Sequence, residues 1–214
     1  MTEILINGPQ GKLHGFYKHS ENSENMGLVF HPRNCIENSV DNNVVNSLFE
    51  SFSNNNFSTL KINFRGINKS EGEIEEDGFG ELSDAASVLD WLQQYNTNSK
   101  ICWVAGFSFG AWVAMQLLMR RPEINGFISV SPPANLRDFS FLAPCPSSGL
   151  IVHGDRDNIA SFDSTKILAE KLQKQKKVDI KFKAIKGADH FYENYSEEFT
   201  LVVDKYIKDN LRSN

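Results

Sequence analysis

The feature that most constrains the fold is a serine between two glycines, Gly106-x-Ser108-x-Gly110, set between two apolar segments. The segment before it, KICWVAG, is rich in strand formers, and the segment after it, FGAWVAMQLLMR, is rich in helix formers. A strand, a sharp turn at serine and a helix is the arrangement that exposes a serine hydroxyl as a nucleophile. The pattern makes Ser108 a candidate nucleophile, the alternative being a small-residue turn into a buried core helix.

Strand-like and helix-like segments alternate along the chain. The expected strands are 11–18, 26–32, 58–66, 100–106, 124–133, 147–155 and 178–187, and the expected helices are 44–52, 81–95, 109–120, 161–175 and a closing helix through 199–207. This alternation predicts an α/β fold, with a mostly parallel sheet covered by helices on both faces. We expect a single domain over 1–214. In such sheets the chemistry lies at the C-terminal ends of the strands.

Two of these strand ends carry the residue types that a nucleophilic serine needs. HGDRDN follows one strand and ADHFY follows a later one, so the order is Ser108, then an aspartate, then His190. A neutral imidazole takes the serine proton, and a carboxylate holds the ring in the right tautomer. For the other histidines a structural hydrogen-bonding role is favoured, although His31, together with Phe107, is also a candidate to contact substrate. Those other histidines are His14, His19, His31 and His153.

The identity of the acid is open between several aspartates. Asp157 lies far enough into its loop to reach the histidine loop, and we favour it over Asp155, which is expected to fix the turn through backbone hydrogen bonds. Asp189 adjoins His190, and neighbouring side chains in an extended segment point apart. Asp163 is the least favoured.

Composition excludes several other classes of protein. The net charge is −5, and the basic residues are scattered apart from KLQKQKK at 171–177, so no nucleic-acid groove is expected. We find neither a signal peptide nor an apolar run of about 20 residues, which predicts no membrane association. Three cysteines, far apart, fit no disulfide or zinc spacing and indicate a reduced, cytoplasmic protein. No metal or cofactor is implied, and the oligomeric state is open.

With these motifs in place, the chain resembles the α/β-hydrolase superfamily, and within it a family of small bacterial serine hydrolases that lack a lid. The resemblance covers nearly the whole chain. It rests on NGPQGKLHGFY, VFHPR, LKINFRGINKSEGE, FGELSDAASVLDWL, CWVAGFSFGAWVAMQLLMRRPEI, LIVHGDRD and GADHFY. It implies an α/β-hydrolase fold and a catalytic triad of Ser108, Asp157 and His190.

The chain departs from this family in the loop after His31-Pro32. The family usually has a second His-Pro and a Gly-Gly pair there, whereas this chain continues as RNCIENSVDNN. That loop commonly supplies one of the two backbone donors of the oxyanion hole. We expect the first donor to be the Phe109 N–H and the second to come from Arg33 or Asn34, because proline has no N–H. In the same loop, Cys35 is treated as incidental.

The resulting hypothesis is an open site that hydrolyses small to medium carboxylic esters or thioesters through an acyl-enzyme on Ser108. Only residues 133–146 lie between the strand that follows the helix at 109–120 and the next strand. So short a connection cannot form a lid domain. Amidase, lactonase and acyltransferase activities use the same residues. A degenerate hydrolase kept as a ligand-binding or scaffolding protein is the non-enzymatic alternative. Phenylalanines are candidates for an apolar wall, namely Phe107, Phe109, Phe139, Phe141 and Phe191, and Arg65 is expected to be structural rather than a substrate clamp.

Overall fold

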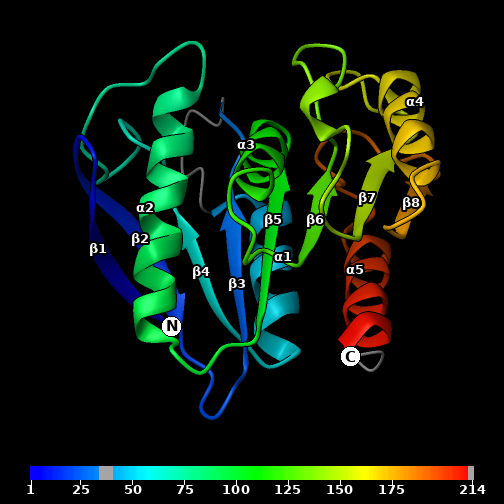
Figure 1. Cartoon of the computed structure of the whole chain (residues 1–214). Coiled ribbons are helices and arrows are strands. Elements are labelled where there is room, and N and C mark those ends of the chain that lie inside the picture. Colours follow the sequence, from blue (N-terminus) through cyan, green and yellow to red (C-terminus); the bar gives the residue numbers. More distant parts are fainter. Residues whose placement is uncertain (34–40, 212–214) are drawn as a thin grey trace.

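A computed structural model describes residues 1–33 and 41–211 and contains an eight-stranded sheet in the order β1-β2-β4-β3-β5-β6-β7-β8 (Figure 1). The strands are β1 (Thr2–Gly8), β2 (Gly11–Lys18), β3 (Asn25–Phe30), β4 (Phe57–Ile62), β5 (Ile101–Phe107), β6 (Gly126–Val130), β7 (Gly149–Gly154) and β8 (Ile180–Ile185). The helices are α1 (Asn43–Asn54), α2 (Phe79–Tyr95), α3 (Phe109–Leu118), α4 (Phe162–Gln173) and α5 (Ser196–Leu211).

The sheet is parallel from β4 through β8 and antiparallel at one edge, where β1 pairs with β2 and β2 pairs with β4. The α/β fold expected from the alternation is therefore confirmed. The sequence analysis missed β1, since only Ile6 of this edge strand is fully buried and Leu5 is exposed, which leaves a weak apolar alternation. The strand expected over 58–66 ends at Ile62, opposite Phe30, because β3 ends there.

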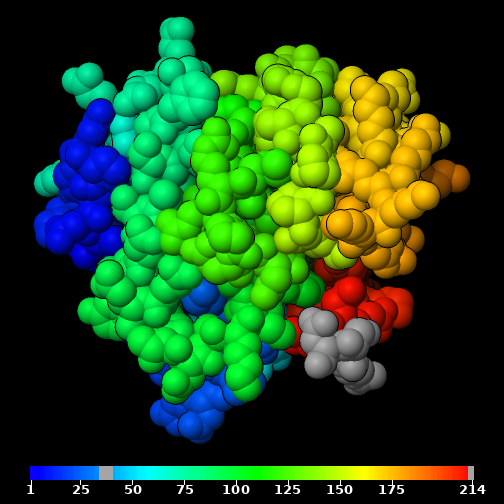
Figure 2. Space-filling model, in the orientation of Figure 1, coloured from blue at the N-terminus to red at the C-terminus, as the bar shows by residue number. Residues whose placement is uncertain are grey.

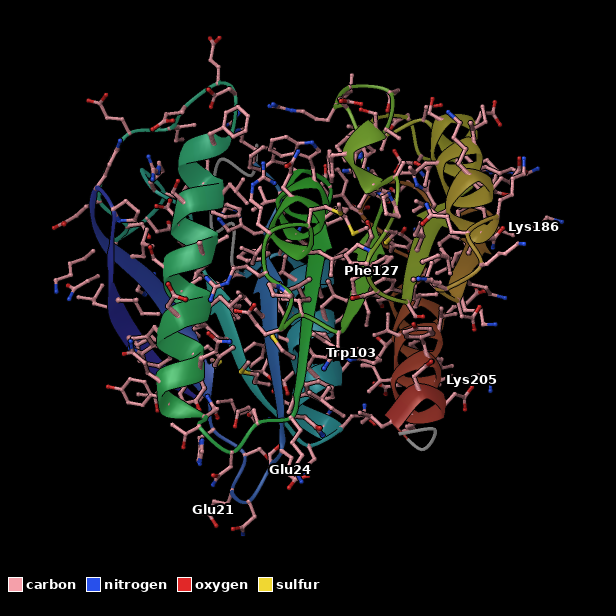
Figure 3. The ribbon with its side chains drawn as sticks, viewed as in Figure 1. Glu21, Glu24, Trp103, Phe127, Lys186 and Lys205 are labelled. Atoms are coloured by element: carbon pink, nitrogen blue, oxygen red, sulfur yellow. The ribbon has the colours of Figure 1, made fainter. Side chains whose placement is uncertain are left out.

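Helices cover both faces of the sheet. Apolar side chains of α1 and α5 form one core layer with β3 and β5, and those of α2, α3 and α4 form a second layer on the opposite face. In the space-filling view of the second face, green to yellow segments that include α2 and α4 form most of the surface (Figure 2). In Figure 3, Trp103 of β5 and Phe127 of β6 lie inside the molecule, whereas Glu24, just before β3, and Lys205 of α5 lie at its periphery.

The connection from β6 to β7 carries no inserted domain. It consists of loops and one short 3-10 helix, η2 (Ser140–Leu142), and lies above the C-terminal ends of the strands (Figure 1). The described residues thus adopt an α/β-hydrolase fold in which no lid domain is inserted between β6 and β7. In the described parts of the chain, none of the helices combines the length and the apolar character that crossing a membrane requires.

Candidate active site

Ser108 occupies a strained turn between β5 and α3. Its φ of 53° and ψ of −118° lie in a region that residues other than glycine rarely adopt. A Cβ on Gly106 would lie 2.2 Å from the Gly110 carbonyl oxygen, and one on Gly110 would lie 2.4 Å from the Phe30 carbonyl oxygen. Both glycines are required because backbone passes against backbone here. All residues of α3 are buried, so the turn is held from behind by the core.

His190 and Asp157 meet across two loops. Asp157 follows β7, His190 follows β8, and the His190 Nδ1–Asp157 Oδ2 distance is 2.7 Å. Both side chains are nearly inaccessible to water, with exposed fractions of 4% for His190 and 0% for Asp157. An imidazole that donates its Nδ1 proton to a carboxylate presents an unprotonated Nε2 to the other side, which is the tautomer a general base needs.

The second oxygen of Asp157 is tied to its own loop. Oδ1 accepts hydrogen bonds from the backbone N–H groups of Ile159 (2.9 Å) and Ala160 (2.8 Å). These bonds close the loop around the carboxylate and fix its direction toward His190. The carboxylate is therefore positioned by backbone rather than by a flexible partner.

A second histidine, His153 at the end of β7, also contacts this carboxylate. Its Nε2 lies 3.3 Å from Asp157 Oδ2 and 3.1 Å from the Ala160 carbonyl oxygen, and both partners are acceptors, so Nε2 carries the proton. His153 Nδ1 is buried without a partner in the described residues. Burial on its own would raise the pKa of the Asp157 carboxyl, but the hydrogen bonds from His153 and His190 outweigh it and lower the pKa below its ordinary value.

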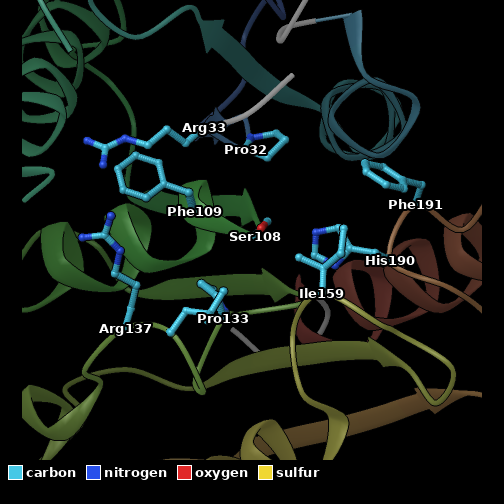
Figure 4. A pocket seen from close by; sticks show the side chains of 10 residues that line it. Pro32, Arg33, Ser108, Phe109, Pro133, Arg137, Ile159, His190 and Phe191 are labelled. Carbon is cyan, nitrogen blue, oxygen red and sulfur yellow. The ribbon is translucent and has the colours of Figure 1, made fainter. Parts of the chain in front are cut away.

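Ser108 and His190 line one cavity of about 260 Å³ (Figure 4). The cavity is bounded by Pro32, Arg33, Ser108, Phe109, Pro133, Leu136, Arg137, Ile159, His190 and Phe191. Among the described side chains, no hydrogen bond joins Ser108 Oγ to His190, and such contacts commonly tighten only when a substrate is bound. The arrangement brings a serine, an oriented imidazole and a carboxylate to the rim where β5, β7 and β8 end.

The other candidate acids point elsewhere. Asp155 was expected to fix its own turn through backbone hydrogen bonds, but its Oδ1 accepts a hydrogen bond from the Gly187 N–H at 2.6 Å, which joins the β7 and β8 loops. Asp189 accepts one from the Phe191 N–H at 3.2 Å. Asp163 lies exposed in the first turn of α4. Of these four aspartates, only Asp157 is hydrogen-bonded to the His190 ring.

The predicted oxyanion donors lie partly outside the described residues. The Phe109 N–H begins α3, where first-turn amides have no acceptor within the helix, and Phe109 lines the cavity. Arg33 also lines the cavity, at its Pro32 edge. Asn34 and Cys35 lie outside the described part of the chain.

His31 and Phe107, the candidates to contact substrate, are buried and do not line the cavity. Phe107 is fully buried and packs its ring 4.8 Å from the His190 ring, supporting the imidazole from behind. His31 is 1% exposed: its Nδ1 donates to the Pro32 carbonyl oxygen and its Nε2 accepts from the Phe64 N–H. Apolar lining comes from Phe109 and Phe191, whereas Phe139 and Phe141 do not line the cavity.

The buried His31 predicts a pH dependence of stability. Burial lowers the pKa of His31 from 6.5 to about 4, so the unfolded chain binds a proton there before the native chain does. The contribution of His31 is fully present above about pH 6.5 and is lost as the pH falls toward 4. Between pH 7 and 5 we expect His31 to cost about 2 kcal/mol of unfolding free energy.

Urea denaturation at both pH values would measure this. His31→Gln should show a loss on acidification that is smaller by about that amount, while His19→Gln, at an exposed histidine, should behave like the wild type. Equal pH dependence of the wild type and His31→Gln would rule out a buried neutral His31.

Arg65 is structural, as expected. It is 2% exposed and donates through Nε and Nη2 to the buried Asp84 carboxylate, at 2.9 and 2.7 Å, and through Nη1 to Glu75 at 2.7 Å. The hydrogen bonds to Asp84 raise the pKa of Arg65. Cys102 and Cys145 are free and buried, and burial raises the pKa of the Cys102 thiol to about 12, which makes it a poor nucleophile.

The sequence analysis did not identify four lining residues, Pro133, Leu136, Arg137 and Ile159. Three of them follow β6 and one follows β7. Their position after the C-terminal ends of parallel strands was an available signal. Nothing in their residue types separated them from ordinary loop residues. Within the described chain, no group of three or more histidine, cysteine, aspartate or glutamate side chains is arranged to hold a metal ion.

Comparisons with known proteins show the same fold. The family described as the alpha/beta hydrolase fold matches residues 13–175. An uncharacterized protein of Rickettsia prowazekii (strain Madrid E) is 45% identical over 212 residues, covering 97% of this chain and 89% of its own. A crystal structure of a protein of unknown function from Agrobacterium tumefaciens is 45% identical, with a TM-score of 0.95 and coverage of 100% and 98%. The structure of an alpha-beta serine hydrolase homologue from Coxiella burnetii is 27% identical, with a TM-score of 0.84 and coverage of 96% of both chains.

Proposed function

Because this chain belongs to the α/β-hydrolase family, we propose that it is a serine hydrolase that cleaves carboxylic esters or thioesters. The observation that carries the proposal is that Ser108 and His190 line the same cavity. Ser108 lies in a strained turn, and the His190 ring is oriented by a hydrogen bond of 2.7 Å from its Nδ1 to Asp157 Oδ2. A serine in a strained turn beside an oriented imidazole is the arrangement that activates a hydroxyl.

In the first half of the proposed reaction, Ser108 Oγ attacks the carbonyl carbon of the substrate while His190 Nε2 takes the hydroxyl proton. The carbonyl oxygen becomes an oxyanion that accepts hydrogen bonds from the Phe109 N–H and from a second amide, that of Arg33 or Asn34. Asp157 stabilises the imidazolium without taking its proton. The intermediate then collapses, the leaving alkoxide or thiolate takes the proton from His190, and an acyl-enzyme remains.

In the second half, water attacks the acyl-enzyme with His190 again acting as the base. The oxyanion forms at the same amides, and collapse releases the carboxylic acid and returns the proton to Ser108. The cavity of about 260 Å³ is at the small end of ligand pockets, which favours short to medium acyl groups. Because no lid domain is inserted between β6 and β7 in the described chain, a larger leaving group could extend out of the cavity.

Intact-mass labelling with a fluorophosphonate tests the proposal without knowledge of the substrate. We expect one equivalent of label on the wild type and none on Ser108→Ala or His190→Ala, since the probe phosphonylates an activated serine. Ser131→Ala, at another serine with positive φ that directly follows β6 and does not line the cavity, serves as the matched control and should still label.

Folded wild-type protein that takes up no label would overturn the enzymatic proposal. The chain would then be a hydrolase-fold binding protein in which the loop after Pro32 has removed the second oxyanion donor. Labelling followed by a panel of esters, thioesters, amides and lactones separates the ester hydrolase from the amidase, lactonase and acyltransferase alternatives.

A further inference from the structure

Two arginines flank the Phe109 ring at one end of the cavity. The guanidinium carbon of Arg33 lies 4.4 Å from the ring centroid and that of Arg137 lies 5.3 Å from it, and both arginines line the cavity. Figure 4 shows Arg33, Phe109 and Arg137 on one side of Ser108, with His190 and Phe191 on the other. The cavity therefore has a cationic end and an imidazole end, with the serine between them.

The charge of Arg33 is matched by a carboxylate. Its Nη2 lies 2.5 Å from Glu81 Oε1, and the Glu81 side chain is only 2% exposed. Further hydrogen bonds go to the carbonyl oxygens of Glu75 and Glu76. Arg33 and Glu81 thus form a nearly neutral pair at the cavity wall.

The charge of Arg137 is not matched in this way. Its Nη1 and Nη2 donate to the carbonyl oxygens of Asp77 and Glu76, each at 3.1 Å. In the described parts of the chain, no carboxylate oxygen lies within 4.0 Å of its guanidinium. Carbonyl oxygens hold the side chain in place but carry no net charge, so Arg137 has no directly paired carboxylate among the described residues.

Arg137 is also held in a fixed position. Its guanidinium lies over Phe109 and, at 5.2 Å, over the ring of Trp112, whose Nε1 donates to the Asp138 carbonyl oxygen. The two hydrogen bonds to carbonyls use one N–H on each terminal nitrogen, which leaves the Nε–H and one N–H on each Nη for a ligand. A guanidinium with parallel donors to spare suits a carboxylate, which it can bind through two hydrogen bonds.

The electrostatic setting favours an anion beside Arg137. Burial lowers the pKa of Arg137, and the positive charge of Arg33 lowers it further, although arginine stays protonated near neutral pH. The guanidinium groups of Arg33 and Arg137 repel each other across the Phe109 ring. The carboxylates of Glu81 and Asp77 offset part of this repulsion. A bound carboxylate would relieve this repulsion.

The orientation of the substrate follows from the proton transfer. His190 protonates the leaving group, so the leaving group lies on the His190 side of Ser108. We propose that the acyl chain extends to the opposite side, toward Arg137, and ends in a carboxylate, so that this enzyme hydrolyses monoesters or monothioesters of dicarboxylic acids. The inference rests on the proposed serine hydrolase function and names its substrate class.

A pair of matched esters tests this. One is the 4-nitrophenyl monoester of adipic acid, and the other is 4-nitrophenyl 6-methylheptanoate, in which an isopropyl group replaces the carboxylate. Water adds across the ester bond in each case, releasing 4-nitrophenol and the acid. For the wild type we expect kcat/KM to be higher for the adipate by at least about 10-fold.

In Arg137→Gln the ratio of the two kcat/KM values should fall by about 10- to 100-fold, the range expected for a lost charge-assisted hydrogen bond. Arg137→Lys should keep part of the preference. Arg156→Gln, at an exposed arginine that does not line the cavity, should leave the ratio unchanged. Raising the salt concentration should lower the ratio in the wild type more than in Arg137→Gln.

The preference for a carboxylate can be absent while Ser108 is still an active nucleophile. A Ser108 that takes up the fluorophosphonate, with equal turnover of the two esters, would overturn the carboxylate specificity alone. If neither ester is cleaved, titration calorimetry with monomethyl adipate decides: binding by the wild type that Arg137→Gln loses supports the carboxylate site, and no binding by the wild type overturns it.

Discussion

Replacing Asp157 with asparagine is expected to lower kcat by about 10⁴-fold without disturbing the fold. Asparagine keeps an oxygen to accept the Ile159 and Ala160 N–H groups, so the loop should retain its shape. Its amide would face His190 Nδ1 as a donor, so the imidazole would have to carry its proton on Nε2 instead. A ring protonated on that side cannot take the proton of Ser108.

The matched control for this prediction is Asp155→Asn, two residues earlier in the same loop. Asp155 accepts a hydrogen bond from the Gly187 N–H and does not contact His190, so its loss should lower kcat by less than about 10-fold. Steady-state kinetics on a 4-nitrophenyl ester, with circular dichroism to check folding, measures both. An Asp157→Asn enzyme that retains more than a tenth of wild-type kcat would remove Asp157 as the acid of the triad.

Asp84→Asn is expected to lower the free energy of unfolding by about 3–5 kcal/mol. Asp84 is fully buried and accepts two hydrogen bonds from the guanidinium of Arg65 and one from its backbone N–H, at 3.2 Å. Within the described chain, the substitution leaves the buried Arg65 with the partly exposed Glu75 as its one direct ion-pair partner. An uncompensated buried cation is far more costly than a missing surface ion pair.

Helix α2 offers the control at Asp90, an exposed carboxylate that pairs with Arg121 at 2.5 Å. Asp90→Asn should cost less than about 1 kcal/mol. The double variant Arg65→Met/Asp84→Leu should recover much of the loss, because it removes both charges from the interior. Urea denaturation near pH 7 compares the four proteins. Equal losses for Asp84→Asn and Asp90→Asn would show that the Arg65–Asp84 pair is not buried in solution.

Sequence alone determined the class of fold and the candidate chemistry, because both depend on local signals. Apolar periodicity distinguishes buried strands from buried helices, and the glycines around Ser108 reflect a turn in which a Cβ has no room. The placement of acid and base candidates after successive strands follows from parallel topology, since parallel strands end at the same edge. Edge strand β1 was missed because, with only Ile6 fully buried, it has little apolar alternation to detect.

Only the tertiary structure decided which side chains meet. Asp155, Asp157 and Asp189 are equivalent as residue types, and Asp157 differs because backbone N–H groups turn its carboxylate toward His190. His31 directly precedes the lining residue Pro32 in the sequence, yet its side chain lies behind the cavity wall. Both of its ring nitrogens are hydrogen-bonded there, to the Pro32 carbonyl oxygen and to the Phe64 N–H.

The same holds for the charge at the cavity. Arg33 and Arg137 are the same residue type, but among the described residues Arg33 is paired with a buried carboxylate whereas Arg137 donates its hydrogen bonds to carbonyl oxygens. Pairing between residues far apart in the chain depends on how loops pack over the sheet. Local sequence patterns therefore do not predict which of these residues will pair.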